Sequence, residues 1–186
     1  MSSEQVQYFP PKPPRCIAAL NPKRTRHSKP TLLLPSHLSV YQGLYDVAIT
    51  ASFIVGCPCG ERAVFLLGYY ATNEGRHKDR IFVGPLSIEC PLCGVVSEFF
   101  DTRKHGWDGE QGVNTHIIGE ANPQRFSCPN CGVAPMILCP NFCYEAPEEF
   151  EGEMRERPQD FFGGFDIVGQ CTRCNALVEI TSFECA

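Results

Sequence analysis

Four cysteine doublets, each on a short turn of the chain, constrain the fold of this sequence more than any other feature. They read CPCG at 57–60, CPLCG at 90–94, CPNCG at 128–132 and CTRCN at 171–175. Each second cysteine precedes a residue that tolerates a positive φ: Gly60, Gly94, Gly132 and Asn175. Two thiolates on one turn reach a single ion only where the chain curls back beneath it and directs backbone N–H groups at the sulfurs. We therefore expect each doublet to supply half of a four-sulfur metal site.

The order of the doublets predicts how they pair. Each set brackets one hairpin: Cys57, Cys59, Cys90 and Cys93 in the first, and Cys128, Cys131, Cys171 and Cys174 in the second. Four thiolates in tetrahedral geometry form a closed zinc site, so the sequence predicts two zinc ions per chain. Two other pairings stay open, namely 90–93 with 128–131, or 128–131 with Cys139 and Cys143. The first doublet is one residue shorter than the others, which predicts a tighter turn and a less symmetrically held ion.

The two halves of the chain repeat one order of elements. In the first half, β-branched and alternating segments predict strands at 45–56, 63–70, 80–89 and 95–100. The second half follows the same order, and one constant shift maps the doublet at 90–93 onto that at 171–174. An acidic insert at 145–157 has the charge pattern of a short helix. The predicted fold class is mostly β, with two modules related by internal duplication and a short helix in the second.

With these doublets, the chain resembles the zinc-ribbon group of folds over residues 45–101 and 125–183. CPCG with CPLCG, and CPNCG with CTRCN, carry the resemblance. It implies two β modules, each stabilised by one structural zinc ion. The chain is also similar to small uncharacterised bacterial proteins with paired CxxC doublets, and that resemblance implies no activity. A thioredoxin-like redox motif fits less well, because none of the doublets lies near a βαβ unit.

Twelve cysteines in 186 residues also raise the question of disulfides. The N-terminus, MSSEQVQYFPPKPPRC, lacks the continuous apolar region of a secretory signal. TLLLP at 31–35 is far too short to span a bilayer. We therefore expect no membrane association and a reducing cytoplasmic compartment, where paired thiols bind metal more often than they form disulfides.

The first 35 residues differ from the rest in charge and composition. Residues 1–30 carry six basic residues against Glu4 alone, a net charge of +5, which leaves −10 for the rest of a chain whose total is −5. Many prolines and few apolar residues predict an extended or disordered arm over 1–35. The favoured interpretation is a solvated tail, because the acidic remainder of the chain repels phosphates. Contact with nucleic acid or an acidic partner is the alternative. The position of Cys16 in this arm suggests no role.

The segment between the modules, 102–124, contains the residues from which an enzyme hypothesis has to start. Imidazoles and carboxylates bind catalytic ions and transfer protons. The candidates are His105, Asp108, Glu110 and His116. Their spacing matches no hydrolase or nucleotide-binding motif, and the four glycines and single tryptophan between 101 and 120 fit an ordered connecting loop. The sequence therefore favours a binding protein over an enzyme.

These inferences divide the chain into an arm at 1–35, a first ribbon at 36–101, a loop at 102–124 and a second ribbon at 125–186. The favoured function is a zinc-stabilised binding or adaptor module whose partner is another protein. Nucleic-acid binding through the arm, and a small hydrolase or transferase built on the loop, are the alternatives. The remaining cysteines of the second half, Cys139, Cys143 and Cys185, are expected to be packing thiols, with ligand roles for the first two as the alternative.

Overall fold

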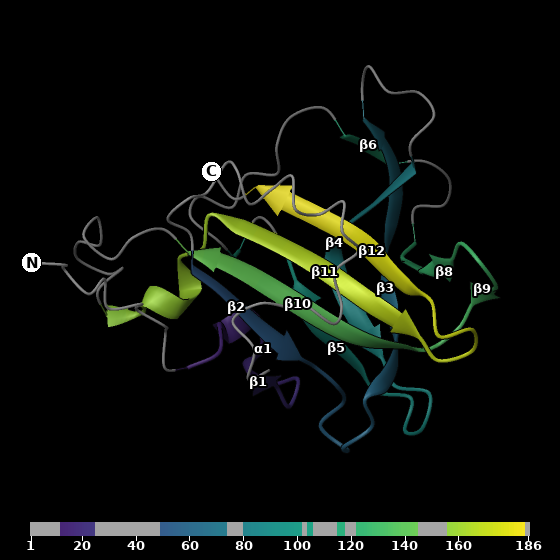
Figure 1. Ribbon diagram of the computed structural model, residues 1–186, viewed down its shortest axis with the longest axis horizontal. Coiled ribbons are helices and arrows are strands. Elements are labelled where there is room, and N and C mark those ends of the chain that lie inside the picture. Colours follow the sequence, from purple (N-terminus) through teal and green to yellow (C-terminus); the bar gives the residue numbers. More distant parts are fainter. Residues whose placement is uncertain are drawn as a thin grey trace, which may run out of the picture.

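The computed structural model describes residues 12–24, 49–73, 80–101, 104–105, 115–117, 122–144 and 156–184. Strands dominate this part of the chain, so the mostly β fold class is confirmed (Figure 1). Helical structure is limited there to short pieces, which include α1 (Arg15–Ala18) and the 3-10 turn η3 (Pro158–Asp160). The helix expected at 145–157 lies almost entirely outside the described residues.

The strands follow the order that the sequence predicts. In the first half they are β1 (Lys23–Arg24), β2 (Ile49–Ile54), β3 (Ala63–Asn73), β4 (Arg80–Glu89), β5 (Val96–Phe100) and β6 (Thr115–Ile117). In the second half they are β7 (Gln124–Arg125), β8 (Ser127–Cys128), β9 (Gly132–Val133), β10 (Met136–Tyr144), β11 (Gly164–Cys171) and β12 (Leu177–Glu184). Each half therefore contains a three-stranded antiparallel unit, β3–β4–β5 in the first and β10–β11–β12 in the second.

Strand β10 joins the two units into one sheet. Along one edge it pairs with β11, and along the other it pairs first with β3, through Met136 opposite Val64, and then with β2, through Asn141 opposite Ser52. Figure 1 shows β2, β10, β11 and β12 side by side, with β3 and β4 crossing behind them. Backbone pairing thus passes from one half of the chain to the other.

Aromatic side chains fill the space between the two units. Phe100 at the end of β5 stacks on Phe165 of β11, with ring centroids 4.0 Å apart and an interplanar angle of 18°. Phe142 and Phe162 pack edge-on at 4.9 Å, and Phe142 also contacts Phe165 at 5.1 Å. All four side chains are at most 1% exposed. Contacts of this kind contribute about 0.5 to 1.5 kcal/mol per pair beyond the burial of apolar area, so this aromatic cluster holds the two units together.

Strand β2 is more deeply buried than its sequence predicts. The alternation over 45–56 indicates a half-buried strand, with Ser52 on the solvent side. In the structure Ser52 is 6% exposed, and its neighbours Ala51 and Phe53 are also buried. The strand lies inside the sheet between β1 and β10, which is a position that a pattern of single residues does not reveal.

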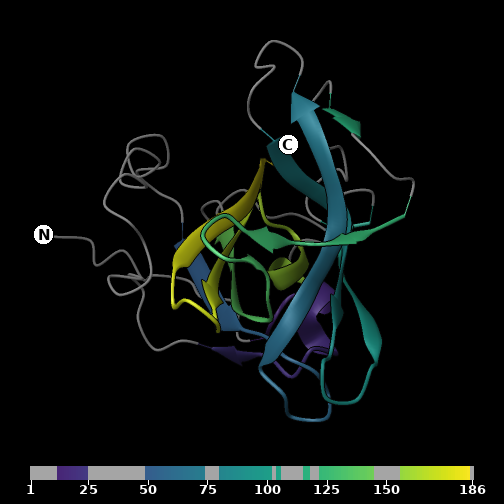
Figure 2. The same ribbon diagram turned by 90° about the vertical axis from the view of Figure 1, so that its right-hand side faces the viewer.

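Part of the predicted arm is packed against the body of the protein. Ile17 and Leu20 are completely buried, and Cys16 is 8% exposed. Arg15 adds a backbone hydrogen bond and an ion pair to the carboxylate of Asp160, at 2.8 and 2.7 Å. Figure 2 shows α1, in purple, beside the teal strands of the first half. For residues 15–20 the expectation of an extended arm is therefore wrong, because an average over charge and proline content hides three apolar side chains clustered on one turn. Residues 1–11 and 25–35 of that arm lie outside the described residues.

Candidate metal centres

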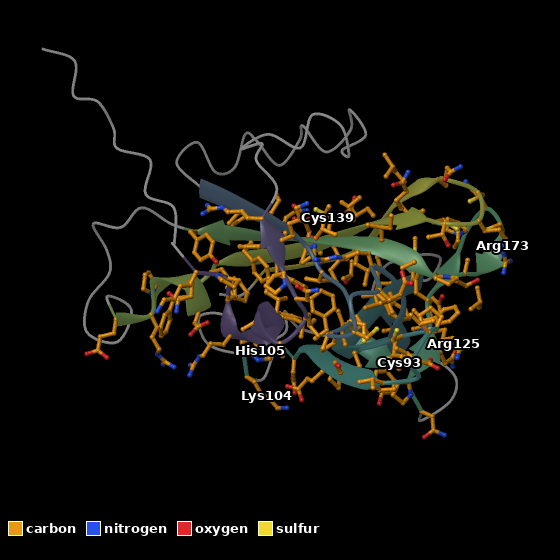
Figure 3. The ribbon with its side chains drawn as sticks, turned by 90° about the horizontal axis from the view of Figure 1, so that it is seen from below. Cys93, Lys104, His105, Arg125, Cys139 and Arg173 are labelled. Carbon is orange, nitrogen blue, oxygen red and sulfur yellow. The ribbon has the colours of Figure 1, made fainter. Side chains whose placement is uncertain are left out.

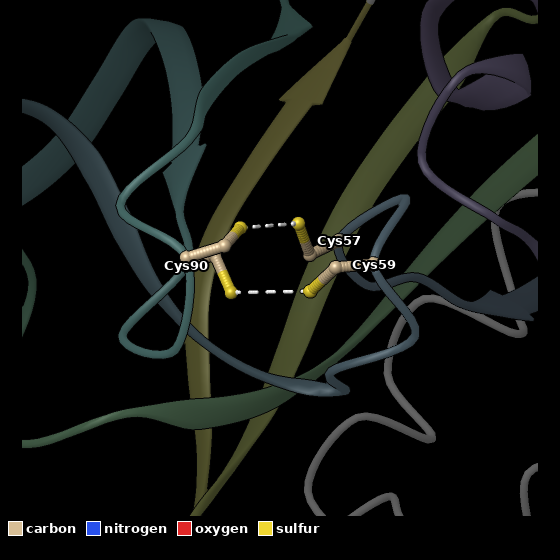
Figure 4. Close-up of side chains that lie close together, drawn as sticks. Cys57, Cys59 and Cys90 are labelled. Atoms are coloured by element: carbon tan, nitrogen blue, oxygen red, sulfur yellow. Dashed lines mark hydrogen bonds between the residues drawn. The ribbon is translucent and has the colours of Figure 1, made fainter.

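The first centre consists of the four cysteines at the open end of the β3–β4 hairpin. The chain enters β3 from one turn (residues 57–61) and leaves β4 into another (residues 90–95), and the pairing of Phe65 with Glu89 places these turns next to each other. The Sγ atoms of Cys57 and Cys93 are 3.5 Å apart, and those of Cys59 and Cys90 are 3.6 Å apart. Figure 4 shows Cys57 and Cys59 facing Cys90 across the gap between the turns.

The second centre forms in the same way at the end of the β10–β11 hairpin. Its two turns are residues 128–133, which form the small β8–β9 hairpin, and residues 171–176, between β11 and β12. The register of β10 with β11 brings Met136 opposite Cys171 and so sets the two turns side by side. The Sγ atoms of Cys128 and Cys174 are 3.7 Å apart, and those of Cys131 and Cys171 are 3.5 Å apart.

The spacing of the sulfurs fits a single tetrahedral ion in each centre. Within each set of four, all Sγ atoms lie within 4.8 Å of one another. A tetrahedron with zinc–sulfur bonds of about 2.3 Å has sulfur–sulfur edges of about 3.8 Å, whereas a disulfide bond is about 2.05 Å long. The cysteines of both centres are free thiols in the structure, and their separations match the tetrahedron. The structure therefore brings together the two sets that the doublet order predicts, and neither of the other pairings.

Backbone geometry explains why each turn can present two sulfurs. Cys90 in the first centre and Cys171 in the second each donate one backbone hydrogen bond and accept another within their own turn. Gly94 N donates to Cys90 O, and Cys90 N donates to Val95 O, at 2.9 and 3.0 Å. Cys171 makes the two equivalent bonds with Asn175 and Ala176, both at 2.9 Å. The residues expected to adopt a positive φ all do so: Gly60 at 103°, Gly94 at 72°, Gly132 at 83° and Asn175 at 59°.

The short first doublet keeps this pattern with one residue removed. Cys57 N donates to Glu61 O, four residues ahead, where Cys90 and Cys171 donate to a residue five ahead. Gly60 N likewise donates to Cys57 O three residues back. The turn is tighter, as predicted, but the sulfur separations are 3.5 and 3.6 Å in the first centre and 3.5 and 3.7 Å in the second. These two separations differ little between the centres, and the less symmetric position of an ion in the first centre stays a prediction.

Hydrogen bonds from backbone N–H groups favour thiolate formation at one cysteine of each centre. Burial would raise the pKa of Cys90, but the N–H groups of Cys93 and Leu92 donate to its sulfur and bring the pKa down to about 7. Burial likewise opposes ionisation of Cys171, and the N–H groups of Cys174 and Arg173 lower its pKa to about 6. Because the thiolate is the form that binds metal, each centre has one ligand prepared at neutral pH. Burial and the neighbouring sulfurs raise the pKa of Cys131 to about 12, and the pKa of Cys57 also rises to about 12 although Cys59 N donates to its sulfur, so the remaining protons have to leave when an ion binds.

The second centre also has a brace made of protein atoms alone. The guanidinium of Arg173 donates to the carbonyls of Cys131 and Val133 in the opposite turn, at 3.0 and 2.9 Å. The hydroxyl of Thr172 donates to Pro135 O at 2.8 Å. Neither contact was predicted from the sequence, because the participating residues are about 40 positions apart and form no motif.

At the first centre, an ion pair lies beside the Cys90 turn. Arg125 binds the carboxylate of Glu89 with two hydrogen bonds, of 2.9 and 2.6 Å, and its guanidinium lies 4.2 Å from the ring centre of Phe65. These hydrogen bonds lower the pKa of Glu89. Since Glu89 directly precedes Cys90, the pair connects the first centre to strand β7 of the second half.

The candidate catalytic residues do not form a site in the described part of the chain. Nδ1 of His105 accepts a hydrogen bond from Asp101 N at 3.0 Å, its ring packs against Phe100, and burial lowers its pKa. His105 thus closes a turn, well away from Cys93 and Arg173 (Figure 3). The backbone of His116 lies in β6, opposite Thr72, where the sequence predicts a loop. Its side chain, Asp108 and Glu110 are outside the described residues.

Cys139 and Cys143 belong to neither centre. Cys139 is 5% exposed on β10, and burial raises its pKa to about 12. Cys143, on the same strand, is half-buried. Neither belongs to a set of potential ligands among the described residues, in agreement with the expectation of packing thiols. Cys185 is outside the described residues.

Comparison with protein-family models, curated proteins and solved structures found no match to the chain. The resemblance to zinc ribbons therefore rests on the doublets and on the geometry of the two centres. Within the part of the chain that the structure describes, no helix has the length and apolar character needed to cross a membrane.

Proposed function

We propose that this chain is a zinc-stabilised protein-binding module with two structural four-cysteine centres. The single observation that carries the proposal is the spacing of the eight sulfurs, two sets of four at near-tetrahedral separations. When all four ligands come from the protein, no position is left for a water or a substrate, and the ion stabilises the fold instead of performing chemistry. Tetrahedral sulfur sites favour zinc or iron, and zinc suits a role without electron transfer.

Exposed apolar side chains beside the first centre support a protein partner. Among the described residues, large exposed hydrophobic side chains are few, and three of the four lie on or next to the Cys90 turn. These are Leu92, 73% exposed, Val96, 57% exposed, and Val95, 48% exposed. Exposed apolar clusters of this kind mark protein interaction sites. We propose that this apolar turn contacts the partner, in the reducing environment of the cytoplasm.

Five of the described cations make contacts that favour a protein partner over nucleic acid. Arg15, Lys104 and Arg125 form ion pairs with carboxylates. Arg62 and Arg173 donate to backbone carbonyls. Phosphate binding by these side chains would break contacts that the fold uses, and the remainder of the chain outside the arm carries a strong negative charge.

Metal content tests the proposal directly. Native mass spectrometry of the chain, purified without added metal, is expected to give two zinc ions per chain. A single ion, or iron with visible absorbance, would contradict it. For the surface, the proteins recovered with the intact chain are compared with those recovered with Leu92→Glu and with Val133→Glu, an exposed apolar control near the second centre. Equal recovery with Leu92→Glu would rule out the apolar turn as the contact site.

A further inference from the structure

The N-terminal segment is attached to both flanks of the short turn of the first centre. Gly56, which immediately precedes Cys57, donates its N–H to Leu20 O at 2.8 Å. Arg62, on the other side of the turn, donates from Nη1 to Asn21 O. The next residues of the segment form β1, in which Lys23 and Arg24 pair with the end of β2 that leads into the turn.

These attachments depend on the shape of the Cys57 turn. The turn is closed by the hydrogen bond from Cys57 N to Glu61 O. Glu61 in turn accepts hydrogen bonds from the N–H groups of Arg62 and Ala63 on its carboxylate, both at 2.8 Å, and so fixes the start of β3. A Cβ atom at Gly56 would lie 2.5 Å from Glu61 O, which shows how closely the two flanks approach. A turn that opens therefore displaces both groups that hold the segment.

The two centres differ in what holds their turns together. In the second centre, Arg173 and Thr172 connect the 171–176 turn to residues 131–135 independently of the thiols. In the first centre, the only hydrogen-bond contacts between the 57–61 and 90–95 turns of the described chain are those between sulfurs. Loss of the ion therefore frees the first centre's turns more completely than the second's.

We propose that the ion of the first centre controls the docking of residues 20–24. With the centre filled, the Cys57 turn is closed and the segment is held on Gly56, Arg62 and β2. With the centre empty, the turn opens and residues 20–24 detach, while Arg15 keeps its contact with Asp160 at the start of α1. The inference rests on the proposed zinc function and adds a metal-dependent conformational change to it. Detachment frees Leu20 from the core and releases the two exposed basic residues of β1.

Limited trypsin digestion measures this change, because Lys23 and Arg24 are themselves cleavage sites and β pairing protects the chain from protease. Cys93→Ser removes an exposed ligand of the first centre, and Cys174→Ser removes an exposed ligand of the second as the matched control. We expect Cys93→Ser to retain one ion and to be cut after residues 23 and 24 roughly tenfold faster than the unsubstituted chain. Cys174→Ser is expected to retain one ion and to be cut at the original rate.

A second variant weakens the attachment of residues 20–24 without removing a metal ligand. Arg62→Ala removes the bond to Asn21 but no ligand, so it should bind two ions and still be cut faster after Lys23. Should Cys93→Ser bind two ions, the zinc assignment itself fails. Two results would overturn the coupling between the first centre and the segment but leave the zinc assignment intact. In one, Cys93→Ser retains one ion and is cut at the unchanged rate. In the other, Cys93→Ser and Cys174→Ser are cut faster to the same extent. Native mass spectrometry on the same samples distinguishes these results.

Discussion

Asn141 of β10 lies directly opposite Asp166 of β11 and donates a hydrogen bond from Nδ2 to Oδ2 at 2.6 Å. Asn141 is 3% exposed, and Cys139 is its buried neighbour on the same face of the strand. The sheet therefore contains a carboxylate whose only described hydrogen-bond partner is a neutral amide. Burial is the main reason that the pKa of Asp166 rises to about 6, with the charge of Glu179 as a smaller contribution in the same direction and the Asn141 bond opposing it.

This raised pKa predicts that Asp166→Asn stabilises the protein at neutral pH. Between about pH 4 and pH 6 the folded state binds a proton at Asp166 that the unfolded chain has lost. The contribution of Asp166 to the free energy of unfolding is therefore fully present below about pH 4 and is lost as the pH rises through about 6. Since the side chain keeps some exposure, we expect a gain of roughly 1 to 2 kcal/mol at pH 7. Urea unfolding of both proteins at pH 4 and pH 7 measures it. A gain of the same size at both values would contradict this cause.

Substitution of single cysteines tests the assignment of the second centre. Cys171→Ser is expected to lose one zinc ion, because three thiolates and a hydroxyl no longer form the closed site. Cys139→Ser should keep both ions and lower the free energy of unfolding by roughly 1 to 2 kcal/mol, since it places a hydroxyl in a buried position. Native mass spectrometry and thermal unfolding measure the two effects. Zinc loss in Cys139→Ser, with both ions kept in Cys171→Ser, would reverse the assignment.

The brace at the second centre predicts how fast a bound metal ion leaves that centre. Arg173→Ala should still bind two ions, but transfer of one ion to a competing chelator should become up to about tenfold faster, since two hydrogen bonds from a charged group are lost. Arg125→Ala is the matched control, because it removes an arginine beside the first centre and leaves the brace intact. Absorbance of a zinc indicator gives both rates. Identical release from Arg173→Ala and the unsubstituted chain would mean that the brace has no effect on metal retention.

The packing of α1 predicts that a substitution at Ile17, which the sequence places in a flexible arm, causes a large loss of stability. Ile17→Ala should reduce stability by about 2 to 4 kcal/mol, because it leaves a cavity at a fully buried site. Lys23→Ala, on the exposed surface of β1, should change it by less than about 0.5 kcal/mol. For the same reason, removal of residues 1–30 should lower the melting temperature. An unchanged melting temperature in Ile17→Ala would mean that the segment does not pack in solution.

The positive φ of Asn175 predicts opposite results for two small replacements. Asn175→Gly should be neutral, because glycine adopts this conformation without strain, whereas Asn175→Ala should cost about 1 kcal/mol. Gly94→Ala at the equivalent position of the first centre should behave like Asn175→Ala. Denaturant unfolding with zinc present compares them. Equal stability of the two Asn175 variants would show that backbone strain is not what restricts this turn.

The two centres were predictable because the residues that form them lie in short, recognisable stretches of the sequence. The residue after each doublet, glycine in three cases and Asn175 in the fourth, indicates the turn, and the order of the four doublets along two hairpins favours the grouping that the structure has. Contacts between distant residues were not predictable in this way. The stacking of Phe100 on Phe165 and the brace from Arg173 depend on which strands become neighbours, and the pattern of one strand carries no such information.

The N-terminal segment shows a different limit of prediction from sequence, which concerns average composition. Its charge and prolines predict an extended arm, but folding depends on where individual apolar groups lie, and Ile17 and Leu20 are buried with the helical turn that carries them. The average composition of the arm therefore does not predict its structure where a few buried side chains determine whether the chain packs. The same holds for β6, whose three residues pair with β3 inside a segment rich in glycine.

The position of β10 has a consequence for the order in which the chain matures on the ribosome. Strand β2 has only the two residues of β1 on one side until β10 is synthesised, and β3, β4 and β5 all come before β10, so the other edge of β2 stays open for several seconds of translation. An open strand edge is a site where nascent chains associate with one another. A fragment that ends between the two halves lacks the strand that covers this edge of β2, and we expect it to self-associate unless the second half is supplied in trans.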